Sequence, residues 1–321
     1  MKNLRKISLA ALILGVTGAI FLVGFFGFAR VTHAILAVGL AKFALFAAWQ
    51  LITMAFLGVA WWVVAATDHN PLPYAWGRMV RDSAGSCLPF SVLGGLVIGA
   101  RAVTLCGISW HRAAVSTIVD VTTEFAAEIA FAGLGLVILL ITVNSPGIRL
   151  PAEIGLGLAV VALIAVTFLQ HGVAPIFVAL GKRLLGPWIE QGKIDFGAEA
   201  ELTETYGKKH ILALGTVLHI LGWVAKGLGN FIAFHLLGVE ISLWAALAIE
   251  GLLHAALAGA VIIPGYAGVQ EAGYIGLGAL WGVPAELCLE VSLLRRARDI
   301  ALGIPILLVW QIVEVKRLKP A

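Results

Sequence analysis

The sequence contains few charged residues. Only 12% of its 321 residues are Asp, Glu, Lys or Arg, which is about half of the roughly 25% found in water-soluble domains. Hydrophobic residues make up 60% of the chain. Most of the chain must therefore face lipid or other apolar helices. The small net charge of +4 is better explained by Lys and Arg at cytoplasmic helix ends than by nucleic-acid binding.

Motifs for cofactor, metal or nucleotide chemistry are also missing. The three cysteines are far apart and have no spacing that indicates a metal site or a disulfide framework. No G-x-x-x-x-G-K-[ST] loop and no H-E-x-x-H pair is present. We therefore expect buried, inert thiols, no cofactor, no bound metal and no ATP hydrolysis by this chain.

Long apolar runs dominate the rest of the sequence and predict membrane helices. They cover 7–28, 37–66, 86–108, 114–143, 153–180, 209–238, 243–263, 266–282 and 286–313. We predict an all-α polytopic membrane protein of about eight transmembrane helices, with 1–321 forming a single transmembrane domain and no soluble catalytic domain. Basic residues at 2–6 and at 316–319 place both termini in the cytoplasm.

One longer polar stretch, 181–208, interrupts this pattern. It mixes acidic and basic residues and contains Trp188. This composition is typical of an interfacial loop with an amphipathic helix.

Two apolar segments begin with helix-breaking residues. The predicted structural breaks are Pro89, Gly94, Gly95, Pro264, Gly265 and Gly268. The same spacing of 31 residues separates Pro89 from Asp120 and Pro264 from Arg295. We interpret 85–128 and 262–300 as two elements of an internal repeat, each either re-entrant or fully crossing. Interrupted helices at matching positions of two halves indicate a transporter's binding site; the alternative is a chance match in a glycine-rich chain.

Several polar residues recur at helical spacing inside the apolar runs. Asp120, Glu124 and Glu128 share one stripe, and a charge in the bilayer centre costs about 2.5–3.5 kcal/mol. Arg296 is expected to point away from the stripe that contains its neighbour Arg295. The candidate substrate-binding and translocation residues are Arg101, Asp120, Glu124, Lys226, Glu250, His254, Gln270, Glu271, Arg295, Arg298 and Asp299. We expect their helices to meet around a partly wet cavity; the alternative is that they only fix helices to one another.

The segments PGYAGVQE at 264–271, GVP at 282–284 and SLLRRARD at 292–299 resemble the flippase-like membrane family related to the transmembrane domain of lysylphosphatidylglycerol synthase. The continuation to Pro305 and the pair Trp310-Gln311 resemble its hopanoid-biosynthesis-associated subgroup. Leu96 follows Gly94 and Gly95, where the wider family often has an acidic residue.

The resemblance implies a multi-pass protein of the bacterial inner membrane that binds or translocates an amphipathic lipid, either a hopanoid or a phospholipid, beside hopanoid-biosynthesis enzymes. Without an aminoacyl-transferase domain, lysine transfer is not expected. In this interpretation Arg295, Arg298 and Lys226 attract the headgroup. Two alternatives remain, a non-catalytic scaffold for hopanoid enzymes and a membrane enzyme that uses Glu250 and His254 as an acid/base pair.

Overall fold

The computed structural model of the chain describes residues 32, 35–88, 91–189, 198–260, 263, 266 and 268–318, without the side chains at 91–93, 168–201 and 203. Within these ranges the chain is helical and contains no β-strand. The first predicted span, 7–28, and the predicted breaks Pro89, Pro264 and Gly265 lie outside the described residues.

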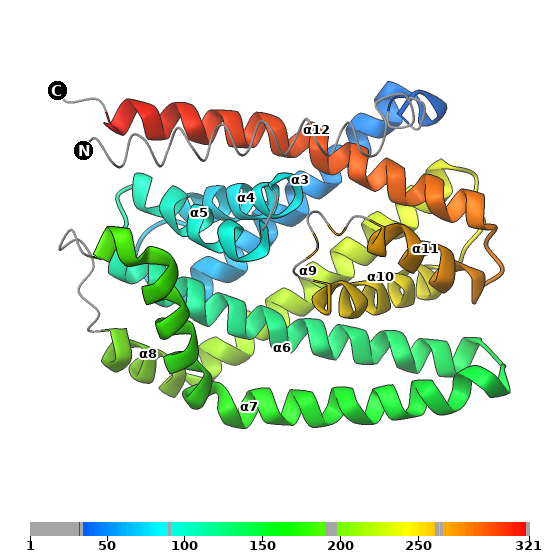
Figure 1. Cartoon of the computed structure of the whole chain (residues 1–321), viewed down its shortest axis with the longest axis horizontal. Coiled ribbons are helices and arrows are strands. Elements are labelled where there is room, and N and C mark those ends of the chain that lie inside the picture. The colour runs from blue at the N-terminus through cyan, green and yellow to red at the C-terminus, as the bar shows by residue number, and fades with distance from the viewer. Residues whose placement is uncertain are drawn as a thin grey trace.

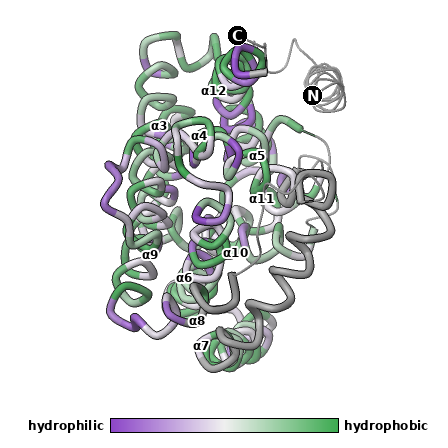
Figure 2. The backbone as a smooth tube through the Cα atoms, turned by 90° about the vertical axis from the view of Figure 1, so that its left-hand side faces the viewer, coloured by the Kyte–Doolittle hydropathy of each residue, from purple (hydrophilic) through white to green (hydrophobic). Residues whose placement is uncertain are grey.

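Four helices are long and apolar enough to cross a membrane. They are α3 (Leu40–Val64), α6 (Trp110–Thr142), the Pro146–Thr167 part of α7 (Pro146–Ile189) and α9 (Lys209–Leu236). Figure 2 shows that hydrophobic residues predominate along them. Leu150, Ile154, Leu158 and Val161 of α7 are all exposed, so one side of this helix suits contact with lipid. The protein is therefore a multi-pass, all-α membrane protein.

Two pairs of short helices lie between the long ones (Figure 1). The first pair is α4 (Leu72–Cys87) and α5 (Ser91–Leu105), and the second is α10 (Leu243–Ala258) and α11 (Val269–Ala279). A helix of 16 residues, such as α4 or α10, is about 24 Å long. It falls short of the roughly 30 Å hydrocarbon core. Neither α4 nor α10 is therefore long enough to cross the membrane as a single straight helix.

The order long, short, short, long occurs twice along the chain. Helices α3 to α6 make up the first half, and α9 to α12 (Ala285–Leu318) make up the second half. Each first short helix packs on the last long helix of the other half, α4 on α12 and α10 on α6. The two halves therefore interlock. The internal repeat proposed for 85–128 and 262–300 stays a prediction, although the helix order agrees with it.

The breaks do not all fall where the sequence suggested. Gly94 and Gly95 lie inside α5 rather than at a break, and the chain leaves α4 at Leu88. Gly95 allows close packing, because a Cβ there would lie 2.8 Å from the Arg81 carbonyl oxygen of α4. Gly268 does mark a break, since it precedes α11 with φ of 81°.

The polar stretch 181–208 is more helical than predicted. Helix α7 continues to Ile189, and α8 (Ala198–Gly207) covers most of the remainder that the structure describes. One cysteine also differs from its prediction, because Cys106 is exposed whereas Cys87 and Cys288 are buried. Cys106 lies in the turn just after α5.

Candidate functional site

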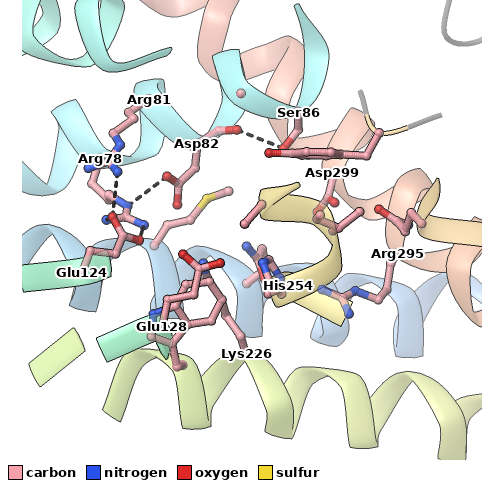
Figure 3. A pocket seen from close by; sticks show the side chains of 18 of the residues that line it. Arg78, Arg81, Asp82, Ser86, Glu124, Glu128, Lys226, His254, Arg295 and Asp299 are labelled. Carbon is pink, nitrogen blue, oxygen red and sulfur yellow. Dashed lines mark hydrogen bonds and ion pairs between the residues drawn. The ribbon is translucent and has the colours of Figure 1, made fainter. Parts of the chain in front are cut away.

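A partly open cavity of about 430 Å³, lined by many charged side chains, lies between the two halves. Its size falls in the range of about 300–1,000 Å³ that is typical of ligand sites. Helices α3, α4, α5, α6, α9, α10, α11 and α12 all contribute to its wall. The charged or titratable side chains that line it are Arg78, Arg81, Asp82, Glu124, Glu128, Lys226, His254, Tyr266, Arg295, Arg296, Arg298 and Asp299. Figure 3 shows Arg78, Arg81 and Glu124 on one side and Arg295 on the other.

The first side of the cavity is an ion-pair network between α4 and α6. Arg78 donates to both carboxylate oxygens of Glu124 at 3.0 and 2.5 Å. Arg81 donates to Asp120 and to Glu124, each at 2.6 Å. The Asp120 carboxylate also lies 3.0 Å from Nε2 of His219 on α9. Arg78, Asp120, Glu124 and His219 are buried and Arg81 is partly buried, so each charge depends on its partners for stability.

The opposite side is a second network, between α10 and α12. Arg295 donates to both carboxylate oxygens of Glu250, one of them at 2.9 Å, and to the Tyr274 hydroxyl. That hydroxyl donates in turn to Asn230 of α9 at 2.9 Å. His254 approaches the same Glu250 carboxylate at 3.2 Å. The network joins all four helices of the second half, α9 to α12, around the buried Glu250 carboxylate and the Arg295 guanidinium.

The two networks occupy matching places in the two halves. On α4, Arg78 and Asp82 are four residues apart and form an ion pair at 2.9 Å. On α10, Glu250 and His254 have the same spacing and lie 3.2 Å from each other. Arg78 and Glu250 each pair with the long helix that ends their own half. The signs are reversed, with a base on α4 and an acid on α10. Charged walls of both halves thus face one cavity.

A third group of contacts fixes the start of α11. The Gly268 N–H donates to the Glu271 carboxylate at 2.8 Å, which caps the helix. Arg296 of α12 donates to the same carboxylate at 2.8 Å. The Gln270 amide donates to the Ser292 hydroxyl at 2.9 Å. The N–H groups at a helix start can bind an anion, but at α11 the Gly268 N–H already donates to Glu271.

Two charged side chains of the cavity have no ionic partner within the described part of the chain. The Lys226 ammonium lies 3.9 Å from the centre of the Trp223 ring, and no carboxylate among the described residues pairs with it. Glu128 of α6 likewise has no hydrogen bond or ion pair with any described residue. Figure 3 places both at the cavity. A bound molecule could therefore pair with either group without breaking an ion pair between described residues.

The family comparison agrees with this architecture. A family described as "Lysylphosphatidylglycerol synthase TM region" matches residues 8–306. The chain belongs to this family. No curated protein and no solved structure matches the chain. As a member of this family, the protein is a membrane protein related to lipid handling.

The structure of this family member brings most of the predicted site residues together. The cavity wall includes Glu124, Lys226, His254, Gln270, Arg295, Arg298 and Asp299. Asp120, Glu250 and Glu271 lie directly behind it, bound to wall residues Arg81, Arg295 and Arg296. Arg298 pairs with its neighbour Asp299 at 2.7 Å and lies over the Phe46 ring.

Two predictions about individual arginines are wrong. Arg101 does not reach the cavity; its guanidinium pairs with Glu314 near the end of α12, at 2.9 Å. Because Glu314 already neutralises the Arg101 guanidinium, Arg101 does not need a partner in the cavity. Arg296 was expected to point away from the face of Arg295, yet both line the cavity, because Arg296 is drawn to Glu271 on α11.

Sequence reasoning missed the wall that α4 contributes. Arg78, Arg81 and Asp82 lie in a helix too polar to register as an apolar run. A signal was present, since R-x-x-R-D occurs at 78–82 and again at 295–299. Both copies face the cavity. Among the described residues, no group of three or more His, Cys, Asp or Glu side chains could hold a metal ion.

Proposed function

We propose that this protein translocates an amphipathic lipid across the bacterial inner membrane by sheltering its headgroup in the cavity. The observation that carries the proposal is the charged Lys226 side chain, which faces a cavity of about 430 Å³ inside a membrane fold and has no ionic partner among the described residues. An ionisable group in a membrane interior is expensive, and is therefore a candidate for function.

The remaining charges support this proposal by forming a stable polar wall. Among the described residues that line the cavity, six are Lys or Arg and four are Asp or Glu. Most of them are paired, so the wall does not need a ligand to remain folded. A headgroup entering the cavity exchanges water contacts for polar protein contacts, while its hydrocarbon chains remain in the bilayer. This lowers the cost of crossing.

The proposal includes several points that rest on sequence alone. Translocation occurs without ATP hydrolysis and without covalent change to the lipid. The basic residues near both ends support a cytoplasmic location for the two termini. The resemblance of 295–311 to the hopanoid-associated subgroup supports a link to hopanoid biosynthesis or export, with a hopanoid or a phospholipid as cargo.

The enzyme alternative receives less support. Glu250 would have to act as a base with His254, but both of its carboxylate oxygens accept hydrogen bonds from Arg295. A carboxylate held by a guanidinium is a weak base. The scaffold alternative predicts that cavity substitutions leave lipid movement unaffected, so the same experiment tests it.

A lipid-movement assay in vesicles tests the proposal. Purified protein is reconstituted into vesicles that contain a phospholipid with a fluorescent acyl chain, and dithionite then quenches the fluorophores in the outer leaflet. We expect wild-type protein to expose the inner-leaflet fluorophores as well. Lys226→Met should slow this phase by about tenfold or more, the effect of losing roughly 1.4 kcal/mol of stabilisation. Arg149→Gln, which changes a highly exposed arginine on α7, should not slow it.

Quenching confined to the outer leaflet, as in protein-free vesicles, would contradict translocation. Equal rates for wild type and Lys226→Met would remove the cavity from the mechanism and favour the scaffold.

A further inference from the structure

An aromatic contact between α6 and α9 lies next to the two unpaired charges along the sequence. The rings of Phe131 on α6 and Trp223 on α9 are stacked, with centroids 6.1 Å apart and an interplanar angle of 22°. Glu128 lies three residues before Phe131, and Lys226 lies three residues after Trp223. Glu128, Trp223 and Lys226 all line the cavity (Figure 3). The Lys226 ammonium is near enough to act electrostatically on the Glu128 carboxylate.

Two hydrogen-bond donors near Glu128, on Lys226 and on Trp223, have no acceptor among the described residues. The Lys226 ammonium carries three N–H groups, and its one close partner among the described residues is the Trp223 ring. The indole Nε1–H of Trp223 is buried, with the residue only 4% exposed, and no described atom accepts its hydrogen bond. A buried donor without an acceptor is costly. Phosphate oxygens would satisfy both donors.

The acidic side is the Glu128 carboxylate. Its electrostatic neighbours among the described residues are Lys226, Glu124 and Tyr266. Glu124 is already bound by Arg78 and Arg81, whereas Glu128 is bound by neither. An ionised carboxylate in a membrane cavity is costly, and a cation that donates hydrogen bonds would offset its desolvation. Lys226 is close enough to influence Glu128 but forms no ion pair with it.

We infer that Glu128, Lys226 and Trp223 form a subsite for a zwitterionic lipid headgroup that carries a phosphodiester and a primary ammonium. This inference rests on the proposed function and specifies its substrate class. Lys226 and the Trp223 N–H bind the phosphate, and Glu128 accepts hydrogen bonds from the ammonium. An anionic headgroup without an amine satisfies Lys226 but faces Glu128 with a like charge, which disfavours it.

Native mass spectrometry with competing lipids tests the inference. Delipidated protein in detergent is offered an equimolar mixture of phosphatidylethanolamine and phosphatidylglycerol with identical acyl chains. We expect wild-type protein to retain phosphatidylethanolamine about tenfold over phosphatidylglycerol, since one charge-assisted hydrogen bond distinguishes the two lipids.

Four variants separate the two sides of the subsite. Glu128→Gln should bring the ratio of the two lipids close to one while phosphatidylglycerol still binds. Lys226→Met should weaken both lipids, and Lys226→Arg should restore them. Trp223→Phe keeps the aromatic stack but removes the N–H, so it should weaken both lipids in parallel. Glu153→Gln on α7, an exposed position, is the matched control for the acid and should keep the wild-type ratio.

Specific outcomes would overturn the inference. Equal retention of the two lipids by wild-type protein, or an unchanged ratio in Glu128→Gln, would refute the amine side while leaving lipid translocation intact. If delipidated wild-type protein binds neither lipid, the proposed function is refuted instead. Free phosphoethanolamine at millimolar concentration should not displace the lipid; if it binds and the lipid does not, the site serves a soluble solute.

Discussion

Arg295 of α12 binds Glu250 of α10 through two hydrogen bonds to the two carboxylate oxygens, and both side chains are buried. The pair leaves little of the Arg295 guanidinium for a ligand, because the same NH1 group also donates to Tyr274. The sequence suggested that Arg295 attracts the headgroup. The structure indicates that Arg295 first joins α12 to α10 and that Lys226 is the less committed cation.

This pair predicts a loss of stability when one partner is removed. Arg295→Met should destabilise the protein by about 3–5 kcal/mol, because it removes both guanidinium hydrogen bonds from the buried Glu250 carboxylate. Thermal unfolding of the purified protein in detergent measures the effect. Arg149→Met on the exposed side of α7 should change the unfolding temperature little.

Removal of both partners should be less harmful than removal of one. The double variant Arg295→Met with Glu250→Leu eliminates the uncompensated charge, so its unfolding temperature should lie above that of Arg295→Met alone. If the unfolding temperature of the double variant falls by the sum of the decreases in the two single variants, the two residues act independently.

The close approach of α6 and α10 gives a second prediction. A Cβ at Gly251 would lie 2.8 Å from the Phe131 carbonyl oxygen, which is backbone and cannot move aside easily. Gly251→Val should therefore cost at least about 1–3 kcal/mol and lower the yield of folded protein. Gly157 on α7 has open space around its Cβ position, so Gly157→Ala should be tolerated. Comparable unfolding temperatures for the two variants would contradict the packing described for α6 and α10.

The start of α11 depends on Glu271. Glu271→Ala removes the cap on Gly268 and the ion pair with Arg296, so it should cost about 1–3 kcal/mol. Hydrogen exchange should rise at the first turn of α11 more than in α3, which Glu271 does not contact. Uniform exchange across both helices would argue against a local capping role.

The sequence predicted the membrane class and part of the cavity for clear physical reasons. A chain with 12% charged residues cannot form an ordinary soluble surface. Helical spacing correctly placed Asp120 and Glu124 on one stripe, because both residues lie on the same helix, α6. Such periodicity is a local property and can be read without knowledge of the fold.

Long-range pairing could not be read in this way. Arg101 finds its partner Glu314 at a sequence separation of 213 residues, and neither residue carries a local sign of the other. The α4 wall was missed because a short polar helix has no hydropathy signal, although its R-x-x-R-D spacing repeats that of α12. Gly94 and Gly95 were interpreted as breaks, but inside α5 glycine can instead permit close packing, as Gly95 does against α4.

The most direct test of the account is the lipid that copurifies with the protein. Lipids extracted from detergent-purified wild type, Lys226→Met and Arg149→Gln are compared by mass spectrometry. The account predicts one headgroup class enriched over the membrane average in wild type and in Arg149→Gln, and lost in Lys226→Met. Bulk membrane lipids in the same ratio in all three samples would contradict a headgroup site in the cavity.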